Sequence, residues 1–310
     1  MRRRALGAWL TLAAAGILGA LIGWSGGGTE TASAGWTQAR SMPQRRSYIA
    51  AAEAGGLIYT VGGMVGETGR PLPTFTRYDP ARDEWATLPQ LPVATRAAAG
   101  VAAGGRVYVV GGTTASGNTR AVYTWNGRRW SGYRSLPVPR FNHAAVALGG
   151  RIYVLGGFDG GEEHDEVFVN EAGSNRPWFR VADVPRPSHA FGVVAFRGEL
   201  WLIGGRRGED VLREVWIYDP RRDRWRRGPA LPRPMELLGA AVVGDEIHAV
   251  WEATYQIYDA ATGRWRDGPR PLVTRHALRA FHADGDLITL GGCTTALRDS
   301  PVVERRAVGA

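Results

Sequence analysis

The most constraining feature of the chain is a spacing between a tryptophan and a glycine pair that recurs along its length. Gly-Gly follows a tryptophan after 26 positions in the five segments that begin at Trp36, Trp85, Trp130, Trp178 and Trp265. A sixth segment begins at Trp225 and carries Trp251-Glu252 in place of the glycine pair. Six ungapped copies of one segment predict a repeat architecture in which each copy is one structural unit.

Each copy contains the signature of a β-hairpin. A turn signal such as Gly149-Gly150 lies 19 and 20 positions after the tryptophan, between short apolar runs such as 144–148 and 152–155. The two-residue turn needs positive φ, which glycine adopts without a steric clash. A third strand, as at 215–220, and a fourth strand that carries the next tryptophan complete four antiparallel strands, here named a to d. This repetition accounts for six of the 12 tryptophans and for many of the 43 glycines among 310 residues.

The two ends of the repeat region indicate how the units are arranged. Residues 36–40 form a strand d without preceding strands, and residues 301–305 form a strand c without a strand d after it. Pairing these strands completes a sixth sheet and removes two exposed edges. The sequence therefore predicts an all-β fold, a monomeric six-bladed β-propeller over residues 35–310 whose last blade is closed by the N-terminal strand.

Several motifs carry a family resemblance. They are the glycine pairs, Tyr78-Asp79-Pro80 and Tyr218-Asp219-Pro220 with a tryptophan six or seven residues on, and Leu-Pro-x-Pro-Arg at 136–140. With these motifs the chain resembles the kelch repeats of the galactose oxidase/kelch superfamily from residue 35 to about residue 306. The departures are Trp251-Glu252 in blade 5 and Val302-Val303 at the usual tyrosine of blade 6. The resemblance implies the propeller, but the family includes protein-binding adaptors, carbohydrate-active enzymes and sugar mutarotases.

The first 34 residues have the parts of an export signal. Arginines at 2–4 precede an uncharged apolar run at 5–24, and Ala-Ser-Ala at 32–34 predicts cleavage. An uncleaved membrane anchor is the alternative, because the run has about the 20 residues that span a bilayer. Both place residues 35–310 outside the cytoplasm, as in kelch proteins of the exported bacterial type. We therefore expect no nucleic-acid partner for this chain of net charge +9, and membrane contact only through the anchor.

Strand direction predicts which face of the ring carries the site. The d-to-a connections and the b-to-c loops emerge at one end, and the b-to-c loops differ in length, which is typical of loops that determine specificity. We therefore expect the ligand at this face. The predicted ligand-binding residues stand 10 or 11 positions after a tryptophan or directly after a glycine pair: Arg46, Arg96, Arg140, His189, Arg206, Arg275 and His276.

Two interpretations of the arginines remain open from the sequence. Their guanidinium groups either converge on the channel mouth and bind carboxylate or sulfate, or donate hydrogen bonds to carbonyls of neighbouring blades. The first interpretation predicts a non-catalytic binding module for an anionic saccharide or an acidic loop of a partner protein. The alternative is a carbohydrate-active enzyme that resembles the exported kelch mutarotases acting on sialic acids, with Glu252 or Glu236 moving a proton.

No metal or cofactor is expected. Residues 162–165 (Glu-Glu-His-Asp) offer oxygen and imidazole ligands for a divalent cation, but acidic loop tips are commonly only solvated. Cys293 is the single cysteine, which excludes a Cys-based zinc or iron–sulfur cluster. Copper oxidases of the galactose oxidase kind crosslink a cysteine to a tyrosine, and no tyrosine partner or histidine pair is evident here. We predict that Cys293 is a buried thiol.

Overall fold

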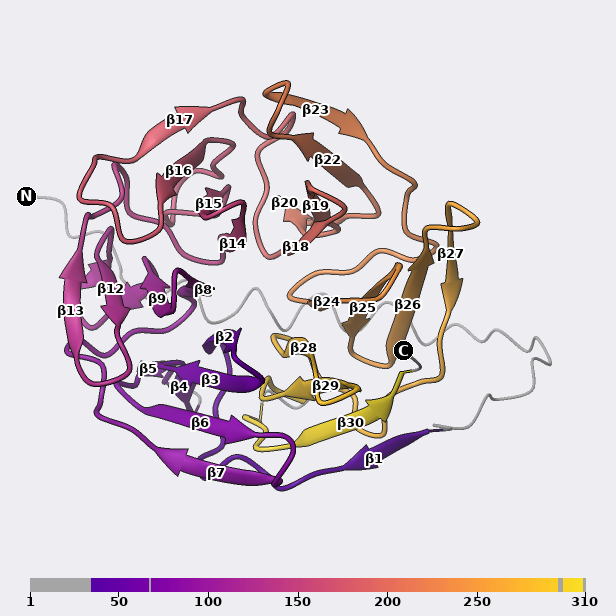
Figure 1. The fold of residues 1–310 in the computed structure, drawn as a ribbon, viewed down its shortest axis with the longest axis horizontal. Coiled ribbons are helices and arrows are strands. Elements are labelled where there is room, and N and C mark those ends of the chain that lie inside the picture. Colours follow the sequence, from indigo (N-terminus) through magenta and orange to yellow (C-terminus); the bar gives the residue numbers. More distant parts are fainter. Residues whose placement is uncertain (1–34, 67, 295–297, 309–310) are drawn as a thin grey trace, which may run out of the picture. The chain divides into compact units, whose positions relative to one another are not determined.

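The computed structural model describes residues 35–66, 68–294 and 298–308, and its regular elements there are β-strands. Figure 1 shows six sheets of four strands in a ring, each with its first strand near the centre and its last strand at the rim. The prediction of an all-β, six-bladed propeller is confirmed.

The first three blades follow each other along the chain. Blade 1 consists of β2 (Ala50–Ala54), β3 (Leu57–Val61), β6 (Phe75–Asp79) and β7 (Glu84–Thr87). Blade 2 consists of β8 (Ala99–Ala103), β9 (Arg106–Val110), β12 (Val122–Trp125) and β13 (Trp130–Tyr133). Blade 3 consists of β14 (Ala144–Leu148), β15 (Arg151–Leu155), β16 (Val167–Glu171) and β17 (Phe179–Val181).

The last three blades complete the ring. Blade 4 consists of β18 (Gly192–Phe196), β19 (Glu199–Ile203), β22 (Val215–Asp219) and β23 (Arg224–Arg227). Blade 5 consists of β24 (Gly239–Val243), β25 (Glu246–Trp251), β26 (Thr254–Asp259) and β27 (Arg264–Asp267). Blade 6 consists of β28 (Arg279–Ala283), β29 (Asp286–Leu290), β30 (Val303–Ala307) and β1 (Trp36–Gln38).

Blade 6 is closed by the N-terminal strand, as predicted. β1 pairs antiparallel with β30, and Trp36 stands opposite Arg306. The chain then continues from β1 to blade 1, where the Arg40 amide donates to Asp83 Oδ1 at 2.9 Å. The interface between blades 6 and 1, which we call the seam, therefore joins segments from both ends of the repeat region.

The repeated tryptophan ties each blade to the one before it. Its indole N–H donates to a backbone carbonyl just beyond strand d of the preceding blade, at 2.8–2.9 Å in all six blades. The acceptors are Pro269, Arg40, Pro89, Arg134, Ala182 and Pro229. A buried indole N–H needs a partner, so this contact gives the repeated tryptophan both its position and its orientation.

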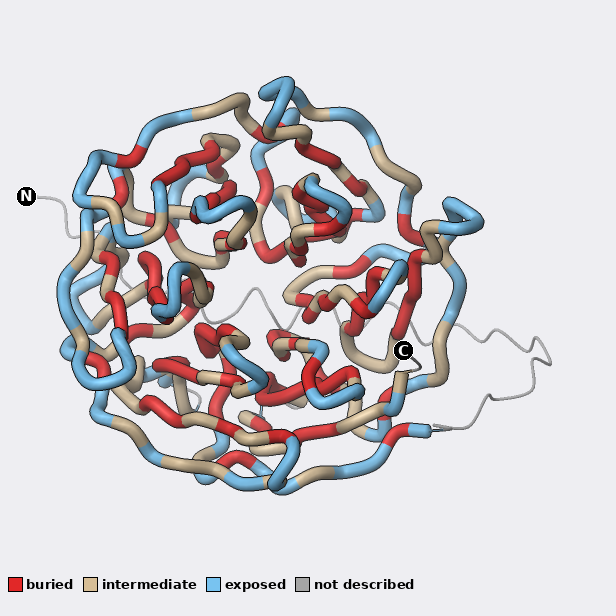
Figure 2. The backbone as a smooth tube through the Cα atoms, viewed as in Figure 1, coloured by how far each residue is buried: buried red, intermediate tan, exposed pale blue. Residues whose placement is uncertain are grey.

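The hydrophobic core lies between the blades. Each apolar cluster combines residues of two neighbouring blades, as where Tyr108 of β9 packs with Ile152 of β15 and Phe168 of β16. Figure 2 shows buried segments along the inner strands and mostly exposed ones at the rim. Each blade is therefore stabilised mainly by its neighbours, and the ring is the folding unit.

A ring of backbone hydrogen bonds surrounds the axis, and we call it the axial ring. Its residues stand 12 positions after each tryptophan and have φ between 46° and 58°: Tyr48, Ala97, Asn142, Ala190, Leu237 and Ala277. From Ala97 onward each amide donates to the carbonyl of the preceding member, at 2.6–3.0 Å. Among the described residues no such bond runs from Tyr48 to Ala277, across the seam. Positive φ is uncommon outside glycine, so the axial ring maintains an unusual backbone conformation in every blade.

The glycine pairs form the next contact outward. The N–H of the second glycine donates to the carbonyl of the next blade, for example Gly112 to Arg140 at 2.8 Å. A Cβ on Gly112 would lie 2.7 Å from the Arg96 carbonyl oxygen, which is too close for any side chain. In blade 5 the Glu252 amide makes the equivalent bond to the Arg275 carbonyl at 2.7 Å. The repeat that lacks the glycine pair therefore still forms this hydrogen bond to the next blade.

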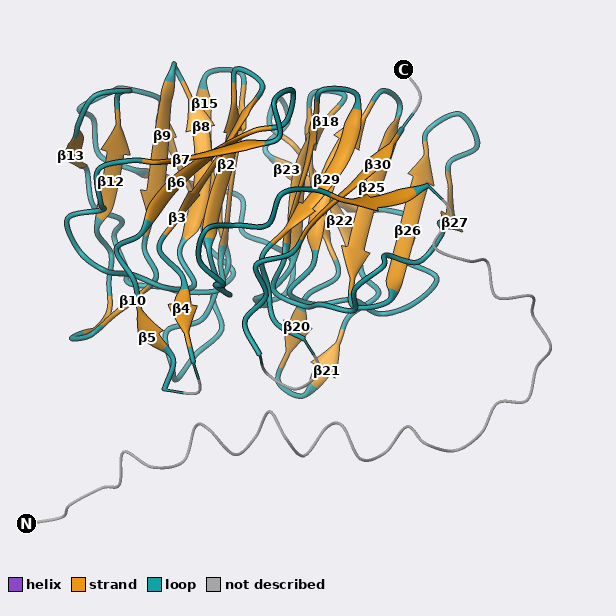
Figure 3. Ribbon diagram, turned by 90° about the horizontal axis from the view of Figure 1, so that it is seen from below, coloured by secondary structure: helices purple, strands orange, loops and turns teal. Residues whose placement is uncertain are grey.

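One face of the ring carries additional hairpins. They are β4 (Met64–Val65) with β5 (Arg70–Pro71), β10 (Thr113–Thr114) with β11 (Gly117–Asn118), and β20 (Arg206–Arg207) with β21 (Asp210–Val211). Figure 3 shows them projecting from the same end of the propeller. They are b-to-c loops, and they lie at the face where the sequence analysis expects the ligand. In blade 5 a turn of two residues replaces the loop, because Trp251 already pairs with Thr254.

The predicted export segment, residues 1–34, lies outside the described residues. No helix with the length and apolar character of a membrane span occurs in the described part of the chain.

Candidate functional site

Three of the predicted ligand-binding arginines lie inside the blades. Arg46, Arg140 and Arg275 stand 10 positions after their tryptophans, and none has exposed surface. Arg46 Nη1 donates to the Gly62 carbonyl at 2.8 Å, and Nη2 donates to Thr60 Oγ1 at 2.8 Å and to Thr76 Oγ1 at 3.0 Å. Burial lowers the pKa of Arg46 to about 10.

The other two arginines repeat this arrangement with a carboxylate added. Arg140 Nη1 donates to the Gly156 carbonyl at 2.7 Å, and Nη2 lies 3.2 Å from Glu166 Oε2. Arg275 Nη1 donates to Gly291 at 2.8 Å, and Nη2 forms an ion pair with the fully buried Glu304. The expectation that Arg46, Arg140 and Arg275 contact a ligand is therefore corrected. Each side chain links strands b and c of its own blade and donates to the carbonyl of the first glycine of the pair.

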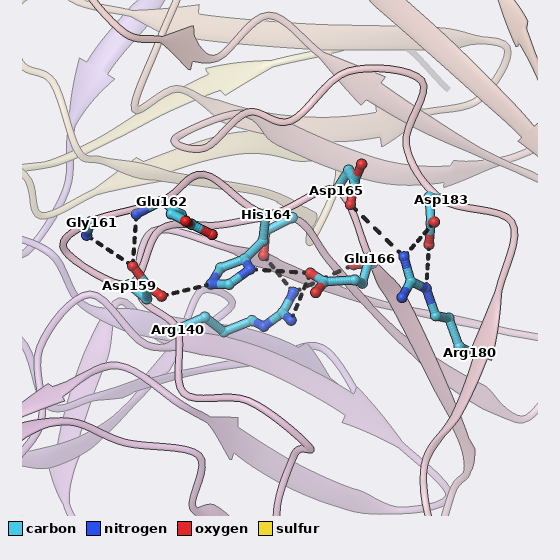
Figure 4. A network of polar contacts seen from close by, with 10 residues as sticks. Arg140, Asp159, Gly161, Glu162, His164, Asp165, Glu166, Arg180 and Asp183 are labelled. Atoms are coloured by element: carbon cyan, nitrogen blue, oxygen red, sulfur yellow. Dashed lines mark hydrogen bonds and ion pairs between the residues drawn. The ribbon is translucent and has the colours of Figure 1, made fainter.

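The acidic loop of blade 3 belongs to the same network. Figure 4 shows the imidazole of His164 between two carboxylates, 3.2 Å from Glu166 and 3.6 Å from Asp159. Asp159 also accepts the amides of Gly161 and Glu162 at 2.8 Å, and these bonds lower the pKa of its carboxyl. No group of three or more His, Cys, Asp or Glu side chains in the described residues is arranged to hold a metal ion. These side chains instead fix the loop to Arg140.

The residues 11 positions after each tryptophan lie at the mouth of the ring. Five of the six form an isolated bridge with the residue that follows a glycine pair, in the pairs Ser47 with Met64, Arg96 with Thr113, Phe141 with Phe158, His189 with Arg206, and His276 with Cys293. The sixth residue at this position is Glu236. The structure thus brings the d-to-a residues Arg96, His189 and His276 to the same face as Arg206. That these four residues bind a ligand stays a prediction.

The charges at the mouth are mixed. Arg206 Nη1 lies 2.7 Å from Glu236 Oε1, and His189 Nδ1 lies 3.2 Å from Glu163 Oε1. Arg96 differs, because its Nη1 contacts the Met64 sulfur at 3.4 Å and no carboxylate of the described residues lies within 4.0 Å of it. Among the mouth arginines, Arg96 is therefore the cation most available to a ligand.

Tyr48 is the mouth residue that the sequence reasoning missed. Burial raises the pKa of its hydroxyl, and its surroundings include Cys293 and the charged side chains of Glu236, Arg96 and Arg206. These four residues come from blades 6, 5, 2 and 4, so the tyrosine lies close to the axis. The sequence did carry a signal for it: Tyr48 is the only aromatic residue at this repeat position, where the other five copies have Ala, Asn or Leu.

Glu252 and Cys293 lie on either side of His276. Cys293 Sγ is 2.9 Å from His276 Nε2, and His276 Nδ1 is 3.9 Å from Glu252 Oε1. Burial raises the pKa of Cys293 to about 12, so the thiol is protonated at neutral pH and shares a hydrogen bond with the imidazole. The prediction of a buried thiol is confirmed. Burial and the neighbouring Glu236 raise the pKa of Glu252, whose side chain is 37% exposed.

A comparison with protein families agrees with this architecture. The family model of the KLHDC2/KLHL20/DRC7 Kelch-repeats domain matches residues 48–250, which is well over half of the chain. The chain belongs to the kelch-repeat family. No curated protein matches the sequence. A kelch propeller indicates a protein-interaction or binding module, and the fold alone does not define its ligand.

Proposed function

We propose that the chain is an extracytoplasmic binding module that holds an acidic loop of a partner protein at the face with the additional hairpins. The observation that carries the proposal is Arg96, a guanidinium at the mouth without a carboxylate partner among the described residues. A carboxylate of the partner would supply that ion pair, with the planar geometry that arginine favours. An anionic saccharide offers the same carboxylate and is the alternative ligand.

An aromatic row next in the ring supports a protein ligand. Phe141 and Phe158 pack edge to face at 5.5 Å between ring centroids, and Phe158 stacks on His189 at 5.4 Å. All three side chains are partly exposed at the mouth. Aromatic residues and arginine dominate the energetic centres of protein interfaces, and both occur here within adjacent blades.

The experiment compares two charge reversals in the full chain. Fluorescence anisotropy measures binding of aspartate- and glutamate-rich peptides, with sialic and glucuronic acids as competing ligands. We expect Arg96→Glu to abolish binding and Arg224→Glu, on the exposed outer strand β23, to leave the Kd unchanged. An unchanged Kd for Arg96→Glu would contradict the proposal, and competition by sugar acids without peptide binding would favour the saccharide.

Export is a separate part of the proposal and rests on the composition of residues 1–34. Protease treatment of intact cells that produce the full chain should degrade the propeller if it faces outward. A propeller that becomes accessible only after lysis would contradict export and would leave the mouth site as proposed.

A second candidate function is the mutarotase-like activity. It is favoured by Glu252, a partly exposed carboxyl with a raised pKa beside the imidazole of His276. Such a carboxyl is suited to donate and accept a proton during ring opening of a sugar. An NMR assay of sugar-acid anomerisation tests it: acceleration that is lost in Glu252→Gln supports the enzyme, and no acceleration over buffer excludes it for the acids tested.

A further inference from the structure

Two side chains of the mouth, one of each charge, lack an oppositely charged partner in the part of the chain that the structure describes. Arg96 of blade 2 contacts the Met64 sulfur and has no carboxylate within 4.0 Å. Glu252 of blade 5 has the imidazole of His276 at 3.9 Å and no arginine within 4.0 Å. Burial lowers the pKa of His276, so that imidazole is neutral at pH 7 and leaves the Glu252 charge uncompensated.

Three other carboxylates at the mouth already have partners. Each accepts a contact at 2.5–3.2 Å, in the sets Glu236 with Arg206, Glu163 with His189, and Asp299 with Ser47 and the Gly66 amide. Glu252 has no comparable contact, and burial together with the charge of Glu236 raises its pKa. A nearby cation offsets both of these effects. Of the four carboxylates, Glu252 is therefore the one that an additional cation would stabilise most.

Arg96 and Glu252 belong to opposite sides of the ring, with Tyr48 between them. Blades 2 and 5 are three positions apart in a ring of six, so they lie across the axis from each other (Figure 1). Tyr48 is partly exposed, and its surroundings include both Arg96 and Glu236 of blade 5. Its hydroxyl has no hydrogen-bond partner among the described residues. A ligand that spans the two charges would pass this hydroxyl, which can donate to or accept from a peptide group.

The loops around the mouth leave one side low. Blades 1, 2 and 4 carry the projecting hairpins (Figure 3). In blade 5, strands β25 and β26 are joined by Glu252 and Ala253 alone. A chain segment that lies across the mouth can therefore leave it over blade 5 without meeting a projecting hairpin, and it passes Glu252 as it does so.

We propose that the mouth binds an extended segment of a partner protein that places an acidic residue at Arg96 and a lysine or arginine at Glu252. This inference rests on the proposed function and adds a second determinant of opposite charge. An acidic segment alone satisfies Arg96 but leaves the partly buried Glu252 without a cation. The pattern of charges along the partner, rather than its total charge, therefore determines which segment is bound.

Fluorescence anisotropy of the full chain with matched peptides tests this inference. Every peptide carries the same pair of glutamates and, about two to six residues away in either direction, a lysine or a glutamine, since an extended chain advances about 3.3 Å per residue. At the best spacing we expect the lysine peptide to bind about tenfold more tightly than its glutamine counterpart. Glu252→Gln should abolish this difference by weakening the lysine peptide alone. Glu84→Gln, on the exposed outer strand β7, is the control and should retain it.

Two further variants separate this inference from the proposed function. Glu252→Lys should reverse the preference, so that a peptide with a third glutamate at the lysine position binds more tightly than the lysine peptide. Tyr48→Phe should weaken the lysine and glutamine peptides equally, by about threefold, because it removes one hydrogen bond to the backbone.

The outcomes distinguish two failures. If glutamate peptides bind and Arg96→Glu abolishes their binding, but lysine gives no advantage or keeps its advantage in Glu252→Gln, the second determinant is overturned and the proposed function stands. If no glutamate peptide binds the full chain, the proposed function fails and this inference fails with it.

Discussion

Two consecutive residues of the repeat have opposite surroundings. Arg275 has no exposed surface and binds groups of its own blade, whereas the side chain of His276 is 17% exposed and lies at the mouth. Consecutive side chains of extended backbone point to opposite sides, so one step along the chain separates the interior of a blade from the ligand face. The repeated arginine therefore belongs to the fold, and the residue after it belongs to the site.

Removal of the buried arginine should have the largest effect. Arg275→Ala leaves the Glu304 carboxylate buried without its ion pair, which lowers the free energy of unfolding by about 3–5 kcal/mol. His276→Ala should lower it by about 1 kcal/mol or less. Urea denaturation of the full chain measures both. The double variant Arg275→Met with Glu304→Leu should recover most of the loss, and equal effects of the two single variants would contradict the contrast.

The buried histidines should make the protein less stable in acid. Burial lowers the pKa of His143 to about 3 and that of His248 to about 4. The unfolded chain takes up a proton on each below about pH 6.5, while the folded chain stays neutral until its lower pKa. Stability therefore falls with pH in this window, by about 2 kcal/mol per histidine between pH 7 and pH 5.

The measurement is urea denaturation at both pH values in gluconate buffer. His143→Leu should reduce the difference between pH 7 and pH 5 by about 2 kcal/mol. His282→Gln, on an exposed part of β28, is the matched control and should leave the difference unchanged. A wild-type and a His143→Leu protein with equal pH dependence would show that this buried imidazole does not contribute.

Glu252 tests whether a residue at the mouth reduces stability. Its φ of 51° is unfavourable for a side chain, and its amide bond to Arg275 needs no side chain. Glu252→Gly should therefore raise the free energy of unfolding by about 1 kcal/mol. Asp83 has a similar φ of 52° but accepts hydrogen bonds from Tyr78 and Arg40, so Asp83→Gly should destabilise. Thermal unfolding compares them, and a destabilised Glu252→Gly would mean that this carboxylate supports the fold.

Arg96 should show the smallest effect on stability. Its guanidinium has no carboxylate partner among the described residues, so Arg96→Ala should change the free energy of unfolding by no more than about 0.5 kcal/mol. Binding of an acidic ligand should be lost in the same variant. A large loss of stability would place Arg96 with the arginines inside the blades.

The sequence predicted the parts of the structure that arise from local contacts. The hairpin turns and the spacing from tryptophan to the glycine pair lie within one ungapped segment, and the unpaired strands at the two ends indicated closure. Whether the arginine side chains point into the blade or toward the ligand face was not predictable in this way. It depends on distant acceptors: Thr76 comes 30 residues after Arg46, and Glu304 comes 29 residues after Arg275. Tyr48 and Arg279 gain their surroundings only when six blades meet at one axis, which no single repeat encodes.

The axial ring has a consequence for how the propeller opens. The amides of Ala97, Asn142, Ala190, Leu237 and Ala277 exchange with solvent only when neighbouring blades separate, since each is bonded across a blade boundary. The Tyr48 amide has no such bond among the described residues, so its exchange needs only a local fluctuation at the seam. Under force or at high temperature, the first fracture should run between blades 6 and 1, beside Arg279. The axial ring is thus open at one of its six blade boundaries among the described residues, while the outer strands keep the propeller closed there.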